Sequence, residues 1–176
     1  MNLDAIKGQD LEWHQPEALR RRYELSAGER TIGSVRFESG FGSLATAEFG
    51  ELAWTFKRTG FFSPKITVRA AGSDVELAVF SPGWMGSGWL VFSSGRRYHL
   101  RHTNFWATEW VFEAEDGSAA VTLSPKAAFF KQGGKASLSA GAAGLEEAPI
   151  LLLLIWYVRV LMNEDAAAAA TVAASS

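Results

Sequence analysis

Apolar and polar residues alternate along short stretches of the chain between Tyr23 and Ala140. The alternation is clearest at 52–57, 65–70, 74–79 and 109–113. A β-strand turns successive side chains to opposite faces, so a period of two is typical of a strand with one buried face. The pattern therefore predicts that this part of the chain forms short β-strands.

Turn-forming residues separate these stretches at short intervals. The dipeptides typical of hairpin turns are Ala27-Gly28, Gly72-Ser73, Ser94-Gly95 and Asp116-Gly117. Glycine favours such turns because it adopts positive φ without a steric penalty. Counting the stretches between turns gives about twelve strands, at the spacing of a β-sandwich or a β-barrel.

The pattern changes after a small-residue linker at 141–144. Acidic residues and Pro149 are typical of a helix start, and the segment 150–158 that follows has no polar face before Arg159. A helix that is apolar all round must be buried on all sides. We therefore predict a buried helix at 147–163, which Asn163 would end.

A closed barrel can bury such a helix on every side. The apolar segment 149–162 would span about 21 Å as a helix, and strands of six to eight residues span about 20–26 Å. A barrel of about twelve strands is too wide for its own side chains to fill. The sequence thus predicts a mainly β fold, a closed antiparallel barrel of about twelve strands around a central hydrophobic C-terminal α-helix.

We place this barrel domain at 20–163, with an N-terminal extension at 1–19 and an Ala-rich flexible tail at 164–176. Arg159 would be a costly isolated charge inside the barrel. We expect it to reach the barrel mouth or to pair with Glu48 or Glu51.

In this architecture the chain resembles the tubby-like barrels, which include the tubby C-terminal domain, the LURP-one-related proteins and the phospholipid scramblases. The segments that carry the resemblance are 23–37, 95–101, 110–117 and 150–162. The resemblance implies a barrel around a helix and functions that differ within the family, from phosphoinositide binding in tubby to lipid movement in scramblases. The chain lacks an acidic calcium loop, a cysteine for palmitoylation and a Pro-rich arm, which weighs against a scramblase. No residue matches a tubby lipid-binding motif.

Composition narrows the function classes further. The chain has 176 residues, 48% of them apolar and 20% charged, which is typical of a globular protein. Without cysteine it has no disulfide scaffold, no Cys-based zinc site, no iron–sulfur cluster and no thiol nucleophile. A formal net charge of −2 weighs against nucleic-acid binding. We expect no cofactor, no metal and no catalytic residues, and therefore no enzyme.

The segment 150–158 is also a candidate membrane span. It is nine residues long and continues past Arg159 only to Met162, whereas a spanning helix needs about 20 apolar residues. The segment 1–16 lacks the pattern of a secretory signal. We expect a cytoplasmic protein, with peripheral membrane association as one option and a tail anchor through 150–162 as an alternative.

One stretch, Leu77 to Thr108, contains no acidic residue. The ligand-binding candidates in it are Arg96, Arg97, His99, Arg101, Trp84 and Trp89. Cationic groups interleaved with aromatic rings suit an anionic ligand with a flat or apolar part, such as a lipid headgroup or a nucleotide. The alternative is that the Trp residues fill the barrel wall and the Arg residues solvate its outer face. The basic run 20–22 would extend such a patch or act as a soluble cap.

Two further pairs of residues are weaker candidates for a functional site. His99 and His102 lie three apart in a predicted strand and would face opposite sides, which argues against a metal pair. The paired acids Glu146 and Glu147 are explained by the helix dipole. The sequence therefore favours a binding or scaffold module for anionic lipid or a protein partner. A calycin-like barrel with a hollow lumen and an external helix remains an alternative.

Overall fold

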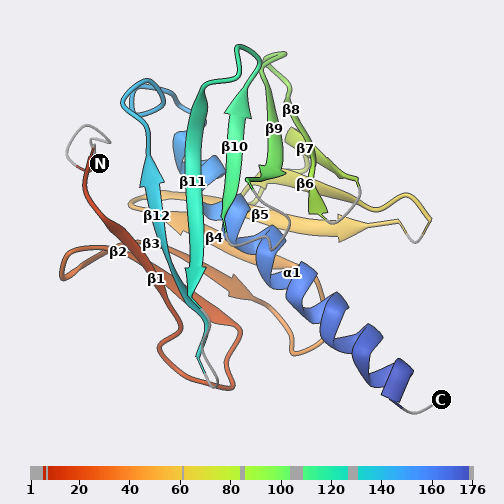
Figure 1. Cartoon of the computed structure of the whole chain (residues 1–176). Helices are drawn as coiled ribbons and strands as arrows, with labels where there is room; N and C mark the ends of the chain where they lie inside the picture. The colour runs from red at the N-terminus through yellow and green to blue at the C-terminus, as the bar shows by residue number, and fades with distance from the viewer. Residues whose placement is uncertain are drawn as a thin grey trace.

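The fold was described from a computed structural model of the chain, which defines residues 6, 8–60, 62–83, 86–103, 109–126 and 131–174 (Figure 1). These described residues form twelve strands followed by one helix. The strands are β1 (Leu11–His14), β2 (Arg22–Ala27), β3 (Arg30–Phe37), β4 (Ala45–Phe49), β5 (Leu52–Thr59), β6 (Lys65–Ala70), β7 (Glu76–Pro82), β8 (Gly88–Phe92), β9 (Arg97–His102), β10 (Trp110–Ala114), β11 (Ala119–Lys126) and β12 (Gly133–Leu138). The helix is α1 (Ala148–Ala174).

The strands form one closed antiparallel barrel in which each strand pairs with its neighbours in sequence. The short strand β1 closes it, because Trp13 pairs with Gly134 of β12 on one side and with Leu25 of β2 on the other. The predicted mainly β fold and closed barrel are confirmed. Closure leaves no unpaired sheet edge, which removes a site for edge-to-edge aggregation.

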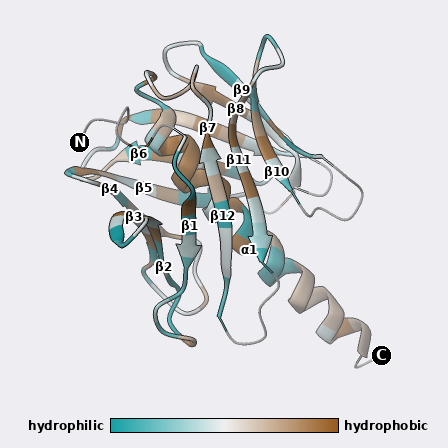
Figure 2. Cartoon of the chain, turned by 60° about the vertical axis from the view of Figure 1, so that its left-hand side comes forward, coloured by the Kyte–Doolittle hydropathy of each residue, from teal (hydrophilic) through white to brown (hydrophobic). Residues whose placement is uncertain are grey.

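The helix α1 runs through the barrel, and every residue from Ala148 to Leu161 is buried (Figure 2). Its Trp156 ring stacks on Trp13 of β1 at a centroid distance of 4.9 Å, and its Tyr157 ring stacks on Phe37 of β3 at 5.3 Å. The wall lacks a side chain at Gly134, where an added Cβ would lie 3.3 Å from the Trp156 ring. The helix therefore packs inside the barrel, and an external helix beside a hollow lumen is not the architecture of this chain.

Two boundaries differ from the expected ones. The barrel begins at Leu11 and not at residue 20, because the four residues of β1 alternate buried and exposed over too short a run to stand out in the sequence. The helix continues past Asn163 to Ala174, because alanine has the highest helix propensity and Asn163 alone does not offset it. Among the described residues, no helix combines the length and the hydropathy that a bilayer span requires.

The barrel has two ends, which we name by the helix. The entry end, where α1 begins, carries the connections 28–29, 50–51, 71–75, 93–96, 115–118 and 139–147. The exit end, where α1 leaves the barrel, carries the connections 15–21, 38–44, 60–64, 83–87, 103–109 and 127–132. Hairpin connections are two to five residues long at the entry end and five to seven at the exit end, so the exit end has more room for a binding surface.

Candidate functional site

The acid-free stretch places three of its candidate residues together on the outer face of β8 and β9. Trp89 and His99 are cross-strand partners, and their rings stack at a centroid distance of 4.7 Å. The guanidinium of Arg97 lies 4.8 Å from the centre of the Trp89 ring. We call Trp89, Arg97 and His99 the outer-face stack. His102 contacts Trp110 instead, at a centroid distance of 4.3 Å.

Each arginine of this stretch is paired with an acid from another part of the chain. Arg96 donates to Glu147 of the segment before α1 at 2.8 Å. Arg97 lies 3.7 Å from Glu115, and Arg101 donates to Glu113 of β10. The bond to Arg101 lowers the pKa of Glu113 and raises that of Arg101. The fold thus supplies the carboxylates that the stretch lacks, and the local cationic character is reduced.

The remaining candidate, Trp84, lies outside the described residues. Its neighbour Gly83 directly follows β7 and is the first residue of an exit-end connection. Arg96, in contrast, lies in the entry-end turn between β8 and β9. The structure therefore brings Trp89, Arg97 and His99 together and places Arg96 and Arg101 beside different acids.

A second group of cationic side chains gathers at the exit end. The connection 15–21 and the adjoining strands β2 and β3 form a pocket of about 250 Å³. We call it the arginine pocket; its lining residues are Pro16, Glu17, Arg20, Arg21, Arg22, Arg36 and Phe37. Four arginines thus line one cavity, and each lies within 4 Å of a carboxylate, which belongs to Glu17, Glu164, Glu24 and Glu38 for Arg20, Arg21, Arg22 and Arg36 respectively.

The register of the barrel sets two of these arginines against each other. Arg22 of β2 and Arg36 of β3 are direct cross-strand partners. Like charges in that position destabilise a sheet. Their acid neighbours compensate in part, because Arg22 lies 2.9 Å from Glu24 and Arg36 lies 3.8 Å from Glu38. An anion held between the two guanidinium groups would offset the remaining repulsion.

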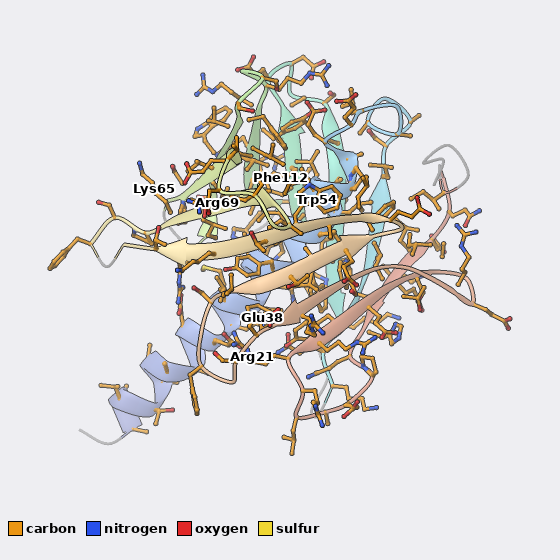
Figure 3. All side chains as sticks on the ribbon, turned by 180° about the vertical axis from the view of Figure 1, so that it is seen from behind. Arg21, Glu38, Trp54, Lys65, Arg69 and Phe112 are labelled. Carbon is orange, nitrogen blue, oxygen red and sulfur yellow. The ribbon has the colours of Figure 1, made fainter. Side chains whose placement is uncertain are left out.

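Arg21 is the fixed member of the arginine pocket, and its side chain is only 14% exposed. It donates to the carbonyl oxygens of Ser39 and Gly42 and makes a two-bond pair with Glu164 of α1, with N–O distances of 2.7 and 2.8 Å. Its guanidinium also lies 3.8 Å from the centre of the Phe37 ring. Figure 3 labels Arg21 and Glu38 close to the part of α1 that leaves the barrel. Arg21 thereby ties the connection 38–44 and α1 to the floor of the pocket.

The buried cation Arg159 also lies toward the exit end. It donates to the Gln132 side-chain oxygen at 3.0 Å, and its guanidinium lies 5.0 Å from the Trp156 ring centre. Burial lowers its pKa, with the phenol of Tyr23 acting in the opposite direction. The expected pairing with Glu48 or Glu51 is wrong, because Glu48 points outward from β4 and Glu51 lies in an entry-end turn. Arg159 is held by an amide oxygen and an aromatic face.

Sequence reasoning named the run 20–22 and missed Arg36. Arg22 and Arg36 lie in β2 and β3, which form a hairpin whose register shifts at a bulge between Leu25 and Ser26. Counting outward from the turn therefore does not settle which residues face each other. The signal that was available is that Arg22 and Arg36 lie at similar distances from Gly28 on either side of the turn.

Comparison of the chain with models of known protein families, with curated proteins and with solved structures returned no match.

Proposed function

We propose that this chain is a non-enzymatic binding module that holds a phosphate-bearing anion, of the kind displayed by anionic lipids, in the arginine pocket. The observation that carries the proposal is the direct pairing of Arg22 with Arg36 beside Arg20 and Arg21. Guanidinium groups form two parallel hydrogen bonds with phosphate, so a cluster of them recognises phosphate in preference to a single point charge.

Binding requires Arg20, Arg22 and Arg36 to exchange their carboxylate partners for a phosphate, and the free-energy cost of this exchange is small. The side chains of Arg20, Arg22 and Arg36 are more than half exposed, and those of their partners Glu17, Glu24 and Glu38 are 68%, 18% and 42% exposed. Exposed ion pairs contribute about 0–1 kcal/mol, and a phosphate can accept two parallel hydrogen bonds from a guanidinium group. Replacing the carboxylates by a phosphate is therefore favourable. Arg21 keeps the pocket in shape because its own partners hold it in place.

The barrel around a central helix supports a tubby-like assignment, which we also propose. That resemblance implies lipid-related binding in some members of the family, and it favours a lipid phosphate over a free one. The assignment rests on the closed barrel of twelve strands and on the enclosed helix.

The second candidate site is the outer-face stack of Trp89, Arg97 and His99. Trp89 is 40% exposed and has a cation over its ring, which suits a flat anionic ligand such as a nucleotide. It ranks second because its arginines pair with three acids on different elements, whereas the four arginines of the arginine pocket line one cavity together.

The two sites are separated by a matched pair of charge reversals, R22E/R36E and R96E/R97E. Each protein is sedimented with vesicles of phosphatidylcholine alone or with phosphatidylserine, and is titrated calorimetrically with inositol hexakisphosphate as a soluble polyphosphate. We expect binding to anionic vesicles that R22E/R36E weakens about tenfold or more and that R96E/R97E leaves unchanged.

Loss of binding only in R96E/R97E would overturn the arginine pocket and assign the outer-face stack. Binding to the soluble polyphosphate without binding to anionic vesicles would assign a free phosphate compound as the ligand. Equal binding of wild type and both variants to either probe would remove the proposal, provided that all three proteins unfold at the same denaturant concentration.

A further inference from the structure

Large apolar side chains lie fully exposed at three separate connections of the exit end. Leu19, Phe41 and Phe62 each have an exposed fraction of at least 95%. They come from the connections 15–21, 38–44 and 60–64, which join different pairs of strands. These side chains lie outside the barrel core, and large exposed apolar side chains that gather at one end of a molecule indicate an interaction surface.

These connections share one end of the molecule because the barrel is antiparallel. Every second connection lies at the same end, and Figure 1 shows these three on the side from which α1 emerges. The emerging part of α1 extends beyond them, and residues 166–174 are exposed and uncharged. The only two acids on that part, Glu164 and Asp165, are paired with Arg21 and Arg58.

Charge is distributed unequally between the two ends. The entry-end connections contain seven acidic residues and a single basic one, Arg96. The exit-end connections contain three acidic and three basic residues. The flanking strand ends add Arg22, Lys65 and Lys126 at the exit end, where α1 adds Glu164 and Asp165, and they add Arg30, Glu76 and Arg97 at the entry end. The barrel is therefore strongly negative at the entry end and close to neutral at the exit end, so a negatively charged surface repels the entry end and is met by the exit end.

We infer that the exit end docks on an anionic lipid bilayer, with the tips of Leu19, Phe41 and Phe62 inserted in the interfacial region. The inference rests on the proposed function, in that the arginine pocket opens at the same end and supplies the headgroup contacts. Separate convex tips fit a fluid surface, which deforms around each of them, whereas a folded protein would need a matching cavity for each tip. Buried apolar area and attraction to anionic lipids add in such a contact.

The depth of insertion is measured with a single fluorophore. The chain has no cysteine, so an introduced cysteine is the only thiol available for labelling with the environment-sensitive dye NBD. Gly40, beside Phe41, and Gly141, at the entry end, have space for a Cβ and no positive φ. With phosphatidylcholine–phosphatidylserine vesicles we expect the NBD emission of G40C to shift to the blue and to be quenched by brominated lipids. The emission of G141C should not change.

Removing the tips tests their contribution to affinity. In F41S/F62S we expect the vesicle partition coefficient to fall about tenfold or more, because two phenylalanines lose their apolar environment. The matched control L52S/V75S removes two exposed apolar residues at the entry end, one at the start of β5 and one in the connection 71–75, and should bind as wild type does. Both sets are surface substitutions and should leave the unfolding midpoint unchanged.

The outcomes separate the inference from the proposed function. Vesicle binding that depends on Arg22 and Arg36, with no change in G40C emission and none in F41S/F62S, would overturn insertion and leave the anion site standing. A blue shift in G40C emission, together with R22E/R36E that still binds vesicles, would support insertion and overturn the anion site. A dimer of the wild type that F41S/F62S abolishes, without any effect on vesicles, would assign the tips to a second copy of this chain and overturn the inference.

Discussion

The two ends of the barrel are built from the same strands, but their connections differ in length, in charge and in exposed apolar side chains. Entry-end hairpins are short and acidic, and the Arg96–Glu147 pair there ties a turn to the start of α1. Exit-end connections are longer and expose two phenylalanines, and one of them forms a pocket with β2 and β3 that four arginines line. One end therefore starts the enclosed helix, and the other carries the pocket in which we propose that an anion binds.

A similar contrast divides α1 itself. Its first half, Ala148–Leu161, is buried among side chains of most of the barrel strands, whereas residues 166–174 contact solvent. The Leu153 side chain lies 3.2 Å from where a Cβ on Gly33 would stand, so the wall is fitted to it. The two halves should therefore respond very differently to the same substitution.

The largest effect is expected from placing a carboxylate in the enclosed half. L153D should abolish folding, because an unpaired buried carboxylate costs several kcal/mol and the total stability of a domain is about 5–15 kcal/mol. The matched change A168D, in the exposed half, should leave the unfolding free energy within about 0.5 kcal/mol of wild type. Circular dichroism with urea unfolding measures both. A folded L153D of normal stability would contradict the enclosed helix.

The barrel was predictable from the sequence because its signals are local. Alternation at 65–70 needs only neighbouring residues to indicate a strand with one buried face, and an apolar run such as 150–158 has few places to be buried other than inside a closed sheet. The strand β1 was missed since Leu11 and Trp13 are just two alternating positions. Their burial depends on β12, more than a hundred residues away in the chain.

The candidate site was less predictable, because it depends on which distant residues the fold brings together. Arg96 and Glu147 are 51 residues apart, and no local pattern in the acid-free stretch indicates the acids that reach it. The exposed tips did have a signal in the sequence. Once strands are assigned, large apolar residues such as Phe41 and Phe62 recur in every second connection, where hairpin loops are normally polar.

An intermediate effect is expected at alkaline pH, and it should begin at the exit end. Burial raises the pKa of Tyr23 to about 12 from 10.0, with the nearby Glu164 adding to the rise. Because the folded-state pKa is the higher one, the neutral phenol contributes stability that is complete below pH 10 and is lost as the pH rises toward 12. The loss should be about 2 kcal/mol.

This loss is measured by urea unfolding at pH 9 and pH 12 in wild type, Y23F and Y98F. Y23F should lose less stability between the two pH values than wild type does. Tyr98 lies toward the entry end and has a pKa raised by burial and by Glu147, so Y98F is the matched control for the other end. An identical pH dependence in wild type and Y23F would show that the alkaline transition starts elsewhere.

The smallest effect concerns the two carboxylates at the point where α1 leaves the barrel. Glu164 accepts hydrogen bonds from Arg21 of the arginine pocket. Asp165 accepts two from Arg58, which lies outside the pocket, at N–O distances of 2.6 and 3.1 Å. E164Q should therefore raise the affinity for inositol hexakisphosphate about threefold, since a competing negative charge leaves the pocket. D165N removes the same charge from the same turn of helix and should change the affinity less. Calorimetric titration at two salt concentrations separates local competition from a general change in net charge, because only the general change is strongly screened. Equal increases in both variants would mean that the anion senses the overall field of the exit end, and that Glu164 does not compete for the pocket.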